Sequence, residues 1–131
     1  MTAHWVTAYI GWPYQRCAQG PEYWDCWSFV RHVQKARYGR DVPFMPSPTS
    51  WGGVAKAIPQ WAAQFGWNPT ETPRDGDAVF LARLKDPTHV GIWVADLKVT
   101  LHCPIGGSVL HDARHLAAAQ WRVRGYFTPG S

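Results

Sequence analysis

The sequence lacks both a long apolar run and a secretion leader. None of its hydrophobic stretches approaches the roughly 18 residues that a transmembrane helix needs. The opening residues MTAHWVTAYIGW contain no charged segment followed by an apolar one, so we expect no secretory signal. The sequence also has no internal repeat and no low-complexity segment. These absences predict a single soluble domain over residues 1–131, with no membrane span.

Cysteine is scarce. The three cysteines are Cys17, Cys26 and Cys103, an odd number that argues against a disulfide framework, and no CxxC pair suggests a zinc ribbon. A metal site built from Cys26, His89, His102 and Cys103 is disfavoured, because these spacings match no zinc signature. In addition, the adjacent His102 and Cys103 would point to opposite faces of a strand. We expect neither a metal nor a cofactor.

Long runs of one charge are also missing. The formal net charge is +4 and the isoelectric point is about 9.2, but the basic residues are scattered. This pattern does not favour nucleic acid, and a mildly positive protein suits an anionic polymer such as the cell wall equally well. Tryptophan, by contrast, is abundant, with nine residues. Most of them are expected to pack in the core, and some could line a cleft or a docking surface.

Helical patterns fill the first half of the sequence. A short amphipathic stretch over 3–10 precedes an irregular loop. Asp25 can then cap a helix over 26–38, for which Gly39 is a natural stop. A second helix is predicted over 53–65, with a kink at its proline.

The hydrophobic period changes to that of strands in the second half. Five short strands are predicted, over 77–82, 90–95, 98–102, 108–112 and 122–127. Asp96-Leu97 and Gly106-Gly107 mark tight turns between them. Helices followed by antiparallel strands predict an α+β domain.

Cys26 is the first candidate for chemistry. It directly follows the predicted cap, so its sulfur would lie at a helix N-terminus, where the dipole and the free N–H groups favour a thiolate. Taken alone, a lone cysteine is more often a buried, inert residue.

Two histidines strengthen the case for catalysis. His89 opens a predicted strand and could present its ring to the packed helix, within reach of the sulfur. His102 ends the next strand of the same hairpin. It could therefore hydrogen-bond the far nitrogen of His89 and fix its tautomer, as the third member of a triad does.

Four segments together resemble the NlpC/P60 family of cell-wall cysteine peptidases. GWPYQRCAQGPEYWDCWSFV is similar to the family's nucleophile region, and RDGDAVFL to its Gly-Asp strand lead-in. HVGIWV resembles its His-Val-Gly strand, and LHC supplies the third polar residue. The resemblance spans most of the chain, in the right order. It implies a papain-like fold, with the nucleophile at a helix N-terminus, and cleavage of peptidoglycan stem peptides.

The resemblance also implies a role for each matching residue. Cys26 would be the nucleophile, His89 the general base and acid, and His102 the orienting residue. Tyr14 would help to form the oxyanion site or hold the substrate, and Asp25 would bind the free amino end of the stem peptide. The two residues after the nucleophile, which are expected to lie at the substrate subsite, are Trp27 and Ser28; the usual family pattern has Ser and Gly there.

The departure at Asp-Cys-Trp points to one branch of the family. Together with Arg31, Tyr38-Gly39 and a later proline, it resembles domains found in the tails of long-tailed phages. This implies tail-tip or baseplate proteins as partners, a location in a virion tail or tail-like particle, and the γ-D-glutamyl–diamino acid bond as target. Two alternatives remain open: a structural tail-tip protein with little activity, and a thiol acyltransferase on the same fold.

Overall fold

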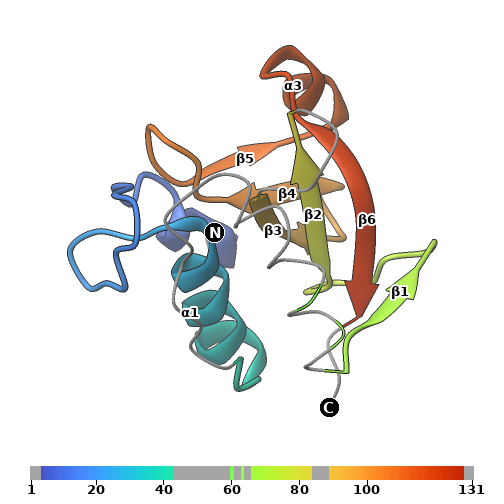
Figure 1. Cartoon of the computed structure of the whole chain (residues 1–131), viewed down its shortest axis with the longest axis horizontal. Coiled ribbons are helices and arrows are strands. Elements are labelled where there is room, and N and C mark those ends of the chain that lie inside the picture. Colours follow the sequence, from blue (N-terminus) through green and yellow to red (C-terminus); the bar gives the residue numbers. More distant parts are fainter. Residues whose placement is uncertain (1–3, 43–59, 61–62, 64–65, 84–88, 129–131) are drawn as a thin grey trace.

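The protein is an α+β domain with one long helix packed on a six-stranded antiparallel sheet (Figure 1). The computed structural model describes residues 4–42, 60, 63, 66–83 and 89–128. The helical elements are η1 (Trp5–Tyr9), α1 (Cys26–Tyr38) and α3 (Ala113–Ala118). The strands are β1 (Asn68–Thr70), β2 (Ala78–Ala82), β3 (His89–Val94), β4 (Val99–His102), β5 (Val109–His111) and β6 (Arg122–Thr128).

The sheet has the strand order β1-β6-β2-β3-β4-β5, and each neighbouring pair is antiparallel. Helix α1 packs against β3 and β4. Alternation along β3 places Val90, Ile92 and Val94 in the core that contains the buried face of α1. A smaller apolar cluster on the opposite face joins Leu116 of α3 to strand β2. The sheet is therefore covered on both faces near its centre.

Local signals account for both ends of α1. The Asp25 carboxylate accepts the backbone N–H of Ser28, and the Ser28 hydroxyl accepts the backbone N–H of Asp25, which forms a capping box. At the other end, Gly39 adopts the left-handed conformation with φ of 68°, which glycine reaches without a steric penalty. The helix spans the predicted residues, and Phe29 and Val33 on its apolar face are fully buried.

The α+β, papain-like class is confirmed, but the details of the prediction need correction. The sheet has six strands rather than about five, because β1 was not predicted, and the short helix α3 was not predicted either. The stretch over 3–10 forms a short 3-10 helix over Trp5–Tyr9. The helix predicted over 53–65 lies outside the described residues, apart from two single positions. Within the described ranges, no helix combines the length and the apolar character that a membrane span would need.

Candidate active site

Cys26 is the first residue of α1, and it is partly buried against the core between the helix and the sheet. The backbone N–H of Val90 lies close enough to the Cys26 sulfur to act against the rise of the thiol pKa. Val90 directly follows His89, so the thiol lies beside the start of β3. The Cys26 thiol thus lies beside the strand that opens with His89, although the two residues are far apart in the sequence.

The electrostatic environment of the thiol differs from the expectation. Burial raises the pKa of Cys26 to about 12, and the neighbouring Asp25 carboxylate adds to the rise. The N–H groups of Val90 and of Cys26 itself act in the opposite direction but do not outweigh these two effects. The expected thiolate at the helix N-terminus is therefore not the resting state: the sulfur carries its proton at neutral pH, and a base must remove it.

His89 is buried at the first position of β3, with 5% of its surface exposed. Its Nε2 lies 2.8 Å from Nδ1 of His102 on β4. Its ring stacks on the indole of Trp121, with centroids 4.7 Å apart and planes 19° apart. Two neighbours therefore hold the ring in place, one through a hydrogen bond and one through stacking.

Strand pairing explains why the two histidines meet. His102 lies opposite Gly91 in the β3–β4 register. His89 is two residues before Gly91 and therefore on the same face of the sheet, so its ring can reach that of His102. A Cβ at position 91 would lie 2.7 Å from Cγ2 of Thr100 and 3.0 Å from Cβ of His102. The glycine of the His-Val-Gly segment therefore permits the close approach of β4 that the pairing requires.

Both imidazoles are neutral at physiological pH. Burial lowers the pKa of His89 to about 3, and the nearby Arg83 acts in the same direction. Burial also lowers the pKa of His102 to about 2, with further contributions from His89 and His111. A neutral His89 has a lone pair on one ring nitrogen and can therefore accept a proton from a thiol.

Tyr14 lies near the thiol. It pairs with Trp24 in an isolated bridge just before α1. Its pKa is raised by burial and by the negative charges that Cys26 and Asp25 can carry. The phenol therefore keeps its proton at neutral pH, and Tyr14 can act as a hydrogen-bond donor.

The other three predicted substrate contacts have structural roles as well. Asp25 and Ser28 are 5% and 3% exposed, and they bond each other in the capping box. The hydroxyl of Ser28 also donates to the carbonyl of Ala18, 2.8 Å away. Trp27 is only 2% exposed and packs against Trp67, so it lies in the core rather than at the expected substrate subsite.

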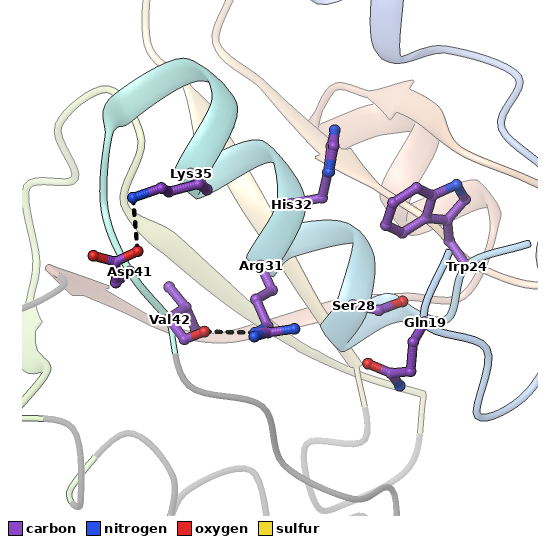
Figure 2. A pocket seen from close by; sticks show the side chains of 8 residues that line it. All are labelled: Gln19, Trp24, Ser28, Arg31, His32, Lys35, Asp41 and Val42. Atoms are coloured by element: carbon purple, nitrogen blue, oxygen red, sulfur yellow. Dashed lines mark hydrogen bonds and ion pairs between the residues drawn. The ribbon is translucent and has the colours of Figure 1, made fainter. Parts of the chain in front are cut away.

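A cavity of about 260 Å³ lies on the outer face of α1 (Figure 2). Arg31 Nε donates to the carbonyl of Val42 over 2.7 Å, and Lys35 pairs with Asp41 over 2.8 Å. The lining is mostly polar and includes three side chains that can carry positive charge. It consists of Gln19, Trp24, Ser28, Arg31, His32, Lys35, Asp41 and Val42.

The sequence pattern did not identify three residues around the histidines. Nδ1 of His111 on β5 lies 2.9 Å from Nε2 of His102, and Arg83 stands over the Trp121 ring at 4.1 Å. A third histidine, His111 in the strand predicted over 108–112, was the one available signal. Across the described part of the chain, no group of three or more His, Cys, Asp or Glu side chains is arranged to hold a metal ion.

Comparisons with known proteins point to one family and one fold. The sequence model of the NlpC/P60 family matches residues 11–124. Among solved structures, the chain is similar to the crystal structure of the NlpC/p60 domain of peptidoglycan hydrolase SagA, with a TM-score of 0.63 and 19% sequence identity. The match covers 94% of this chain and 92% of that one. The comparison with curated proteins gives no match.

Proposed function

The chain belongs to the NlpC/P60 family, and from this premise we propose that it is a peptidoglycan hydrolase that acts as a cysteine endopeptidase. One observation carries the proposal: the Cys26 thiol lies beside β3, where His89 is held by His102 and Trp121. A thiol, a neutral imidazole and an orienting group are the parts that nucleophilic catalysis by cysteine requires.

The arrangement supports the following reaction. Nε2 of His89 faces His102, so Nδ1 is the nitrogen that receives the Cys26 proton as the sulfur attacks the carbonyl carbon of the substrate amide. The tetrahedral intermediate then collapses to a thioester, and the same proton passes to the departing amine. Water, activated by His89, hydrolyses the thioester and releases the acid and the thiol. Since the resting pair is neutral, proton removal accompanies the attack.

Two donors are available for the oxyanion of the intermediate. The backbone N–H of Cys26 lies at the start of α1, where the helix dipole favours negative charge. The hydroxyl of Tyr14 lies close enough to Cys26 for a negative charge on the sulfur to raise the pKa of the phenol. We assign the developing negative charge to these two donors.

The proposed target is the γ-D-glutamyl–diamino acid bond of the stem peptide. Family resemblance supplies this assignment, with Asp25 receiving the free amino end of the peptide. Since Asp25 lies next to the nucleophile in sequence and affects its pKa, a cation bound there would lie near the reacting sulfur. The buried position of Trp27 removes it from this proposed subsite.

We further propose that the protein works as a tail-tip component of a phage or tail-like particle and acts on the cell wall from there. The Asp-Cys-Trp start of α1 and the pattern around Tyr38-Gly39 support this proposal. The alternatives keep the fold: a structural tail-tip protein with little activity, and a thiol acyltransferase. Detection of the protein in purified particles, by mass spectrometry, would support the tail location, and its absence from them would contradict it.

The activity is tested by digesting purified peptidoglycan and identifying the fragments by mass spectrometry. We expect fragments that end at D-glutamate, paired with new amino groups on the diamino acid. Protein blocked with iodoacetamide is the control and should release none. Intact peptidoglycan after treatment with folded protein would contradict the hydrolase, and would favour the structural alternative.

A further inference from the structure

Three imidazole rings form a continuous chain from the active site toward the surface. Nε2 of His89 lies 2.8 Å from Nδ1 of His102, and Nε2 of His102 lies 2.9 Å from Nδ1 of His111. His102 is completely buried and uses both ring nitrogens in this chain. His111 lies on the terminal strand β5 and is half-buried. This row of rings begins at His89, the proposed base, and ends at His111, which the proposed mechanism does not use.

A chain of neutral imidazoles has a direction, because each ring has one N–H and one lone pair. In one direction, Nε2–H of each ring donates to Nδ1 of the next, which leaves Nδ1 of His89 with a lone pair. In the other direction, Nδ1–H of each ring donates back toward the active site, and Nδ1 of His89 then carries a proton. Only the first direction lets His89 take the proton of the Cys26 thiol.

We propose that His111 is a positioning residue of the active site: by accepting Nε2–H of His102, it selects the direction of the chain in which His89 can act as base. The inference rests on the proposed roles of Cys26 and His89. His111 itself contacts neither the thiol nor the substrate. His111 acts through His102: the tautomer of His102 that it favours determines, through the next hydrogen bond, which nitrogen of His89 carries the proton.

Protonation of His111 would reverse the chain. Imidazolium carries N–H on both nitrogens, so Nδ1 of His111 would become a donor facing His102, and His102 would have to accept at Nε2. Its remaining N–H would then point at Nε2 of His89, which forces the proton of His89 onto Nδ1. The productive direction therefore exists only while His111 is neutral.

The surroundings of His111 favour its neutral form. Burial lowers the pKa of His111 below its usual value near 6.5, and His115 of α3 acts in the same direction, whereas Asp112 opposes them. His111 faces His102 of β4. It also borders a cavity whose lining includes two further titratable side chains, Lys98 and Tyr126. Above the pKa of His111, the ring is neutral and the productive direction is available. As the pH falls through that pKa, which lies below 6.5, the productive direction is lost.

The test uses the reactivity of Cys26 with 2,2′-dithiodipyridine between pH 4 and 8, in the full chain carrying Cys17→Ser to silence the exposed thiol. His111→Ala removes the acceptor. His111→Asn keeps an oxygen at the place of Nδ1 but cannot become a cation. His4→Asn is the matched control, because His4 bonds Asp96 and has no contact with the chain. Two-bond ¹⁵N–¹H NMR spectra report the tautomer of His102.

We expect His111→Ala to slow the reaction of Cys26 at pH 7 on the order of tenfold, and His102 to lose its single Nε2–H tautomer. His111→Asn should stay within about threefold of wild type and should keep its reactivity to lower pH than wild type. Wild-type rates and an unchanged tautomer in His111→Ala would overturn the proposal. Equal losses in both variants would also overturn it, since a purely structural role predicts them.

This experiment separates the inference from the proposed function. The reaction of Cys26 with the disulfide reagent needs no peptidoglycan, so the role of His111 can be established in a protein that cleaves none. Conversely, a wild-type protein that cleaves peptidoglycan while its His111 variants react normally would leave the hydrolase in place and remove the positioning role.

Discussion

Neutralising Asp25 should make the Cys26 thiol more reactive while impairing catalysis. The carboxylate is buried beside the nucleophile and raises the pKa of Cys26, second in effect only to burial. The change Asp25→Asn removes the charge and keeps the cap of α1, because asparagine caps helices about as well as aspartate. The perturbation therefore isolates electrostatics from folding.

The magnitude follows from Coulomb's law. If the two unit charges are taken to be about 10 Å apart, at an effective dielectric constant near 20, they interact by about 1.7 kcal/mol, so loss of Asp25 should lower the pKa of Cys26 by roughly one unit or slightly more. Far below that pKa, a one-unit fall gives about tenfold more thiolate. Each thiolate is about threefold less nucleophilic, because nucleophilicity falls with basicity, so alkylation should become about threefold faster.

The assay is alkylation by iodoacetamide at pH 7 in the Cys17→Ser background, with Asp96→Asn as control for the same change of charge at an exposed turn. Cleavage of stem peptides should move in the opposite direction, with kcat/KM falling about 10- to 100-fold, because a charge-assisted bond to the amino end is lost. Unchanged or slower alkylation of Cys26 in Asp25→Asn would refute the electrostatic reasoning.

Two further predictions concern the histidines and the core. His89→Ala should reduce kcat by at least about a hundredfold, and His102→Ala by less, because His102 orients the base rather than transferring the proton; equal losses in kinetic assays would contradict this division of roles. Trp27→Ala should lower the free energy of unfolding by about 3–5 kcal/mol, measured by denaturant titration, because the indole is buried against Trp67. A stable Trp27→Ala protein with altered substrate preference would instead return Trp27 to the substrate subsite.

Local signals were sufficient for most of the fold. Asp25 and Gly39 bound α1 because capping depends on a few neighbouring residues, and alternation identified the strands from β2 to β6. The contact between His89 and His102 followed from the hairpin alone, since a short turn fixes which residues lie opposite each other. Strand β1 was missed because three residues with a central proline carry no period, and β6, the strand with which it pairs, lies far along the chain.

The chemistry of the site was harder to predict, because it depends on what surrounds each group. The N-terminal position of Cys26 indicated a thiolate, but the desolvation that raises its pKa comes from the packed sheet. Helical spacing does not determine whether Trp27 faces a ligand or the core. The role of Trp121 also depends on long-range packing, which brings the end of the chain onto the ring of His89.

The most direct test of the central claim compares peptidoglycan cleavage by wild type, Cys26→Ala, Cys17→Ala and Cys103→Ala, with circular dichroism to verify folding. The account predicts that Cys26→Ala is folded and releases no fragments, whereas Cys17→Ala keeps most of the activity, as does Cys103→Ala if it folds. Cleavage by folded Cys26→Ala at a rate near that of wild type would contradict the assignment of Cys26 as the nucleophile.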